Sequence, residues 1–159
     1  MATWGATLGR LHPAISARHR TLFRPRGRLR HLVGPLWTHK DADSLAFAIL
    51  PEARHANRLG IRRGGMLMTL ADRVMGETAR AEQPDQRHAT MQLDVDFINA
   101  ARIGKLIEAR ARVVRRTRQL MFIEARLTAG TRILAKGTGI GRLLAARRLR
   151  QPPVKVWSV

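Results

Sequence analysis

The chain has 159 residues, 45% of them hydrophobic, which fits a single globular domain with a buried core. No apolar run approaches the ~20 residues that a membrane-spanning helix needs. The sequence contains no cysteine, so disulfides, thiolate catalysis and zinc–thiolate sites are excluded.

The formal net charge of +19 invites a polyanionic partner. Its distribution weakens that interpretation, because residues 1–40 and 142–159 hold thirteen of the bases and no acid. Two explanations stay open: an arginine-rich surface without a special partner, or true phosphate binding. Nucleic acid is disfavoured as a partner, since four Phe, three Trp and no Tyr leave few rings for base stacking.

Three regions are predicted along the chain. Residues 1–31 are basic and without a sustained period, so we assign them no fold; a leader-like segment, a disordered arm and an upstream start codon all fit. Residues 32–146 form the folded domain, and residues 147–159 form a basic tail. We expect a cytoplasmic protein, with organellar import through the basic first segment left open.

A short strand and a long helix are predicted first. Residues 44–50 form an apolar run that ends at Pro51 and is typical of a strand. After a loop, a helix is predicted over 64–82, and Pro84 stops it. One stripe of this helix follows the i, i+3, i+4, i+7 pattern of a buried face: Leu67, Leu70, Ala71 and Val74.

Beyond the helix the hydrophobic period changes from 3.6 to 2. Alternation predicts strands over 89–97, 105–116, 119–129 and 131–145, and we expect them to form a four-stranded meander. In the first of these strands, Thr90 is expected on the outward face and Leu93 on the inward face. Three glycines in the last strand would let another backbone or a ligand come close: Gly137, Gly139 and Gly141.

One helix with several strands, each apolar on one face, predicts an α+β fold in which a sheet curls around the helix. The open faces and edges favour a dimer or a dimer of dimers.

Gly64 and Gly65 directly precede the helical run. A glycine pair there leaves the first backbone N–H groups uncovered for a ligand, although it also serves as a plain tight turn into a helix. Asp72 lies off the buried stripe. At 100° per residue it falls on a flank made of small and apolar residues, so we expect a subunit contact or a pocket there rather than only a solvated charge: Met68, Met75, Gly76 and Ala79.

The sequence segment that leads into the helix resembles a family motif. Hotdog-fold acyl-CoA thioesterases of the phenylacetate-degradation type carry H-x-N-x-x-G-x-x-H-G-G, followed after seven residues by Asp. Six positions match: His55, Asn57, Gly60, Gly64, Gly65 and Asp72. Arg63 departs from the pattern, because the family usually has a second histidine there. The resemblance covers about residues 36–145.

This resemblance implies a hotdog fold: a curled antiparallel sheet of five to six strands around one long central helix. It also implies an acyl-CoA substrate, hydrolysis to a carboxylic acid and CoA, and a homo-oligomer with shared active sites. Such a protein has no membrane span and needs no cofactor. The six histidines show no ligand spacing, so we predict no metal, and His88 is assigned no role.

Thioester hydrolysis needs donors where negative charge builds on the carbonyl oxygen. The free N–H groups of Gly64 or Gly65, at the positive end of the helix dipole, would supply them. By resemblance Asp72 is the nucleophile or general base. It lies about 12 Å along the axis from the start of its own helix, at 1.5 Å per residue. The resemblance therefore implies that Asp72 faces the glycines of a partner subunit.

The resemblance also gives roles to three further side chains. Asn57 would orient the water or the carbonyl. Thr90 would help hold the water, although an ordinary strand threonine is as good an explanation. His55 would contribute to substrate binding, although a loop histidine is more often a structural hydrogen-bonding residue.

Arg63 stays cationic and cannot act as a base. It would hold a carbonyl or a CoA phosphate, or else pair with Asp72 and weaken its basicity. A non-hydrolytic acyl-CoA-binding module is therefore the alternative function. Arg116 and Arg118, with Arg115, are predicted to bind CoA phosphates near a turn, against the alternative of a solvated hairpin.

Overall fold

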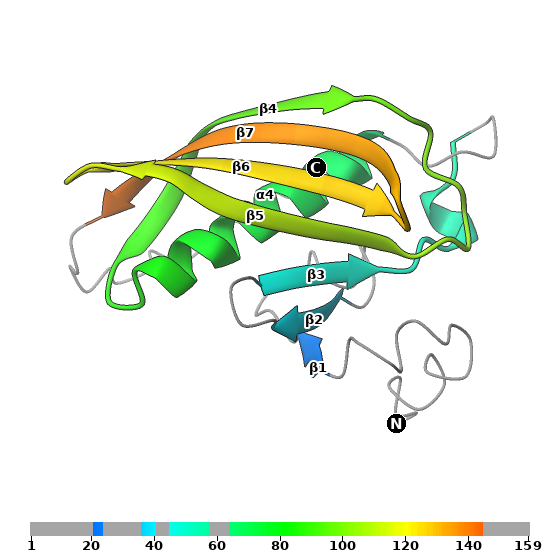
Figure 1. Ribbon diagram of the computed structural model, residues 1–159, viewed down its shortest axis with the longest axis horizontal. Coiled ribbons are helices and arrows are strands. Elements are labelled where there is room, and N and C mark those ends of the chain that lie inside the picture. The colour runs from blue at the N-terminus through cyan, green and yellow to red at the C-terminus, as the bar shows by residue number, and fades with distance from the viewer. Residues whose placement is uncertain (1–20, 24–35, 41–44, 58–63, 145–159) are drawn as a thin grey trace, which may run out of the picture.

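The computed structural model describes residues 21–23, 36–40, 45–57 and 64–144. One long helix, α4 (Gly64–Glu82), lies against one face of a curled antiparallel sheet of seven strands (Figure 1). Among the described residues, no helix has the length and hydropathy to cross a membrane. The strands are β1 (Thr21–Phe23), β2 (Leu36–Lys40), β3 (Leu45–Ile49), β4 (Arg87–Phe97), β5 (Ile107–Arg116), β6 (Leu120–Ala129) and β7 (Arg132–Leu144).

This arrangement confirms the predicted hotdog fold. The helix has the predicted bounds, and the 3.6-residue stripe is buried: Leu67, Leu70, Ala71 and Val74. These side chains meet the apolar inner face of the sheet, including Phe47, Ile107 and Leu127, in one continuous core. Burial of that stripe, rather than helix propensity alone, accounts for most of the stability of α4.

The order of the strands differs from the predicted meander. The sheet runs β1-β2-β3-β5-β6-β7-β4, so β4 pairs with β7 and not with β5. Of the four strands in the predicted meander, three pair in chain order, β5, β6 and β7, and one of the short turns between them contains Gly130 at φ +58°. Residues 98–106 instead connect the two sides of the sheet. Alternation reveals a strand but not its neighbours, and a longer connection frees the next strand to pair elsewhere.

Two strands were not predicted, and they raise the count from the expected five or six to seven. Strand β2 pairs with β3, with Trp37 opposite Ala48. Only Leu36 and Trp37 supply its buried apolar surface, which is too little for a visible period. Strand β1 has three residues and lies in the segment that we assigned no fold. Most of the predicted extension 1–31 and the whole tail 147–159 lie outside the described residues, so those boundaries stay predictions.

Strand β4 contains a bulge that reverses one prediction. Its register with β7 shifts between Thr90 and Gln92, so Met91 is the extra residue and is 62% exposed. The extra residue breaks the alternation, so residues before it point to the opposite face from the one that a period of two predicts. Thr90 therefore faces the helix together with Leu93. A count with period two cannot detect the inserted residue.

The glycines of β7 accommodate the helix. A Cβ added at Gly139 would lie 2.8 Å from Sδ of Met75, and one at Gly137 would lie 3.2 Å from Cε of the same side chain. The space left by these two glycines is therefore filled by a methionine of α4, with the backbone oxygens of Asp94 and Gln92 on β4 close by. Gly141 has looser surroundings, since an added Cβ would meet Ala89 O at 3.8 Å.

Candidate active site

Asp72 and Thr90 come together from α4 and β4. The Thr90 hydroxyl Oγ1 donates a hydrogen bond to Asp72 Oδ1 at 2.8 Å, and both residues are exposed. The contact depends on the bulge at Met91, which turns the threonine toward the helix. The result is an accessible carboxylate, oriented by one hydroxyl, on the flank of α4 that the sequence had singled out.

The two glycines at the start of α4 have different surroundings. A Cβ added at Gly64 would lie 3.1 Å from Cζ of Phe97, so the ring packs closely on this glycine and would have to shift by a few tenths of an ångström to admit a larger residue. A Cβ added at Gly65 would meet no atom within 4 Å. The backbone of Gly65 is therefore open to an approaching molecule, and the first N–H groups of a helix have no intrahelical partner.

One chain does not bring these two features together. Asp72 lies eight residues beyond Gly64, about 12 Å along the helix axis at 1.5 Å per residue. Their neighbours on β4 are also far apart along the strand, because Thr90 contacts Asp72 whereas Phe97 covers Gly64. The carboxylate and the open helix start thus lie at two ends of the surface that α4 and β4 share.

His55 is the last residue of the short 3-10 helix η1 (Ala53–His55), and Asn57 follows it by two residues. His55 is buried, and its Nδ1 accepts a hydrogen bond from the backbone N–H of Glu52 at 2.9 Å. This geometry agrees with the structural interpretation of His55, and its role toward a substrate stays a prediction. Asn57 is half-buried and follows the C-cap residue Ala56. Gly60 and Arg63 lie outside the described residues.

The predicted phosphate-binding arginines lie at the tip of the β5–β6 hairpin. Arg115, Arg116 and Arg118 are all exposed there. Arg116 shares a row of the sheet with Met121, Gly141 and Thr90, three strand spacings apart in total. At roughly 4.8 Å per strand, Arg116 lies about 14 Å from Thr90, too far for direct contact with Asp72.

His88 belongs to the same region, although sequence reasoning gave it no role. It precedes Thr90 by two residues on β4, is half-buried, and its Nε2 would lie 3.1 Å from a Cβ added at Gly76. Burial lowers the pKa of His88 below its usual value; the carboxylates of Glu77 and Asp72 oppose this shift, and Arg80 reinforces it. Its two-residue spacing from Thr90 was the signal that could have found it.

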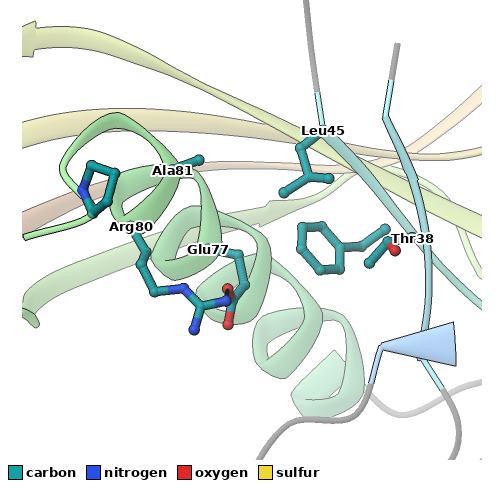
Figure 2. A pocket seen from close by; sticks show the side chains of 7 residues that line it. Thr38, Leu45, Glu77, Arg80 and Ala81 are labelled. Carbon is teal, nitrogen blue, oxygen red and sulfur yellow. Dashed lines mark ion pairs between the residues drawn. The ribbon is translucent and has the colours of Figure 1, made fainter. Parts of the chain in front are cut away.

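A second carboxylate, Glu77, lies on another side of the same helix. Its side chain is buried and forms ion pairs with Arg80 and, at 2.9 Å, with Arg73. Figure 2 shows Glu77 and Arg80 at the wall of a hollow of about 420 Å³, with Leu45 and Thr38 across from them. The hollow is lined by Thr38, Leu45, Phe47, Glu77, Arg80, Ala81 and Pro84. It does not include Asp72.

The described residues contain no group of three or more His, Asp or Glu side chains that could hold a metal ion. The side chains of Asp72, Thr90 and His88 offer a carboxylate, a hydroxyl and an imidazole in this region. Together with open backbone N–H groups, these groups are suited to acyl transfer to water.

Comparison with known proteins agrees with this chemistry. The model of the family described as the thioesterase superfamily matches residues 60–136. A Pseudomonas aeruginosa protein, PA0474, whose name proposes an esterase, is 35% identical over 117 residues, which cover 72% of this chain and 87% of the relative.

Two solved structures share the fold. The Escherichia coli PaaI protein from the phenylacetic acid degradation operon superposes with a TM-score of 0.67 at 16% identity, covering 75% of this chain and 86% of its own. A hypothetical thioesterase of Streptococcus pneumoniae, solved with coenzyme A, gives a TM-score of 0.61 at 17% identity, covering 68% of this chain and 87% of its own.

Proposed function

The chain belongs to the thioesterase superfamily, and from this premise we propose that it is an acyl-CoA thioesterase acting as a homodimer or a dimer of dimers. In this proposal, Asp72 of one subunit works opposite the Gly64–Gly65 helix start of its partner. The observation that carries the proposal is the hydrogen-bonded, exposed carboxylate of Asp72 on the same surface as an uncovered helix start.

The edge of the sheet supports the dimer. Among the described strands, β4 has a single neighbour, β7, so its other edge offers unpaired backbone groups. Four large apolar side chains are exposed along this edge or on the helix flank beside it: Met68 (38%), Met91 (62%), Phe97 (52%) and Ile98 (48%). An exposed apolar strand edge of this kind is suited to pairing with a second copy.

Antiparallel pairing of two β4 strands would also complete the site. Thr90 and Phe97 are seven residues apart, roughly 23 Å at 3.3 Å per residue. Across a two-fold axis near the middle of the strand, the Thr90 end of one copy lies beside the Phe97 end of the other. Because Thr90 holds Asp72 and Phe97 covers Gly64, each carboxylate then faces the partner's open helix start.

The reaction follows from this arrangement. Asp72 takes a proton from water while the water oxygen bonds to the thioester carbonyl carbon. The partner's Gly65 N–H stabilises the oxyanion, and removing such a donor costs about 3 kcal/mol of barrier. The C–S bond then breaks, CoA leaves as the thiolate with the electron pair, and the proton on Asp72 passes to the sulfur. In a variant of this scheme, Asp72 attacks the carbonyl itself and water hydrolyses the resulting anhydride.

The remaining predicted residues act on the substrate. Thr90 orients Asp72 and the water, and Asn57 orients the water or the carbonyl. The phosphates of CoA suit the exposed arginines Arg116 and Arg118, about 14 Å from Thr90, because CoA is an extended molecule with several negative charges. The coenzyme A bound to the Streptococcus pneumoniae relative supports the same class of ligand here.

The alternative function is a module that binds acyl-CoA without hydrolysing it. Arg63, which stands where the family usually has histidine, favours this alternative because a guanidinium cannot take a proton. Both functions involve the same acyl-CoA ligand, so turnover separates them.

The test measures release of the CoA thiol across aliphatic and aromatic acyl-CoA thioesters, with Asp72→Asn and Asn57→Ala beside the parent. We expect hydrolysis by the parent and its loss in Asp72→Asn, with saturable binding retained. Hydrolysis that survives Asp72→Asn would refute the mechanism. Saturable acyl-CoA binding without hydrolysis by the parent would select the binding module.

A further inference from the structure

We propose that His88 is a positioning residue of the Asp72 site: held against Gly76 as a neutral imidazole, it leaves the charge of Asp72 free to accept a proton. When protonated, it places a cation beside that carboxylate and weakens it as a base. This inference deepens the proposed function and rests on it.

The geometry puts two side chains of β4 against two successive turns of α4. Gly76 follows Asp72 by four residues, so both lie on the same flank, one turn apart. Thr90 bonds to Asp72, and His88, two residues earlier on the same strand face, lies over Gly76. The two contacts are two residues apart on the strand and four residues apart on the helix. His88 is therefore the side chain next to Thr90 on the face of β4 that meets α4.

Gly76 makes room for the ring. A Cβ added there would lie 3.1 Å from Nε2 and 3.7 Å from Cε1 of His88. The edge of the imidazole therefore rests on the helix backbone itself, where any other residue would displace it by a few tenths of an ångström or more. The glycine brings the ring closer to the flank that carries Asp72.

The charges around His88 come from α4. Glu77 and Asp72 favour the imidazolium, whereas Arg80 disfavours it. On β7 the partner in register is Leu143, which carries no charge. Burial outweighs the two carboxylates, so the pKa of His88 is lowered and the ring is neutral near pH 7.

A neutral neighbour matters because Asp72 works as an anion. A cation beside a carboxylate favours its ionised form and so reduces its ability to take a proton from water. Protonation of His88 at acid pH would therefore slow hydrolysis. A histidine that only fills space on an edge strand would have no such effect.

The first experiment compares pH profiles of kcat for the parent, His88→Gln and His88→Lys. We expect His88→Gln to keep the neutral-pH rate within about threefold and to shift the acid limb toward lower pH. We expect His88→Lys, with a permanent cation, to lose about tenfold at pH 7.5, because the cation weakens the neighbouring carboxylate as a base. Ala89→Lys is the matched control, because it adds the same charge at the next, exposed position of β4.

Profiles of the parent and His88→Gln that superimpose would overturn the proposal, as would equal losses in His88→Lys and Ala89→Lys. If His88→Lys fails to fold, the comparison of the parent with His88→Gln still decides.

The second experiment does not depend on turnover. The imidazole signal of His88 is assigned among the six histidines by its loss in His88→Gln, and is titrated by NMR in the parent and in Asp72→Asn. Because the carboxylate of Asp72 raises the pKa of His88, its removal should lower that pKa further. An unchanged titration would overturn the pairing of His88 with Asp72. A parent that titrates as expected but hydrolyses nothing would instead refute the proposed function alone.

Discussion

Two carboxylates on α4 show how differently one helix can use the same chemical group. Asp72 and Glu77 are five residues apart, which separates them by roughly 140° around the axis at 100° per residue. Glu77 is buried and paired with the guanidinium groups of Arg73 and Arg80. Asp72 is exposed and receives one hydrogen bond from the neutral hydroxyl of Thr90.

The difference assigns the two groups to different tasks. The charge of a carboxylate between two cations is compensated, and its ion pairs tie it to the folded structure. A carboxylate bonded to one hydroxyl keeps its charge and an accessible oxygen for a substrate. Burial and ion pairing, which at first sight mark a special residue, here mark the structural one.

The largest expected effect tests directly whether Asp72 serves catalysis and Glu77 serves stability. Asp72→Asn should reduce kcat by about 10²–10⁴-fold, the usual contribution of a general base, with little change in melting temperature. Glu77→Gln should leave kcat near the parent value and lower stability by about 1–2 kcal/mol, less than for a fully buried pair because both arginines reach solvent. Thioester assays and thermal unfolding of both variants check this, and the reverse pattern would exchange the two roles.

The next prediction concerns the partner that Asp72 needs and Glu77 does not. Gly65→Pro removes one N–H donor but suits the first turn of a helix, and it should lower kcat by about 10²–10³-fold. Gly65→Ala keeps the donor, and its Cβ meets no atom within 4 Å, so this control should fold and bind as the parent does.

Mixing two inactive variants then tests the shared site. Hybrid dimers of Gly65→Pro with Asp72→Asn contain one intact site each, so random mixing should restore about a quarter of the parent activity. Activity is measured after unfolding and refolding the mixture together. No recovery in a mixture shown to contain hybrid dimers would place both groups of each site in one chain.

A smaller effect is expected at the apolar edge beside Asp72. Met91→Glu should weaken the dimer, because it places a charge on the free edge of β4, and should lower activity in proportion to the dimer lost. Val114→Glu is the control, since Val114 is similarly exposed (58% against 62%) but lies on β5, beyond β6 and β7. Sedimentation and thioester assays at several protein concentrations measure both. Equal dissociation by the two variants would refute β4 as the interface.

The smallest effect is a pH dependence of stability. Because the pKa of His88 is lowered in the folded protein, the unfolded chain binds the proton more readily. The contribution of His88 is therefore fully present above its unfolded pKa of about 6.5 and is lost as pH falls below that value. Denaturant unfolding between pH 5 and 8 should show a shallower decline for His88→Gln than for the parent, and parallel curves would contradict the expectation.

Local patterns in the sequence predicted the helix and the motif that surrounds it. The apolar stripe from Leu67 to Val74 repeats over several turns and stops before Pro84, so few alternatives compete with a helix there. The motif fixed attention on Gly64, Gly65 and Asp72, and the structure gives each a distinct environment.

The features that escaped prediction depend on contacts between distant segments. The pairing of β4 with β7 is set by the connection over residues 98–106 and not by alternation within either strand. The bulge at Met91 adds one residue, which exchanges the faces before and after it. His88 becomes noticeable only when Gly76 is known to lie beneath it.

The contact of Met75 with Gly137 and Gly139 sets the height of α4 above the sheet. A methyl group introduced at Gly139 would lie 2.8 Å from the Met75 sulfur, so either the flexible end of that side chain swings aside or α4 shifts on β7. If the helix shifts, Asp72 moves with it whereas Thr90 stays with β4, and their 2.8 Å hydrogen bond lengthens although neither residue is changed. Two missing side chains in the middle of a strand thus connect the seating of the helix to a reactive distance elsewhere on the molecule.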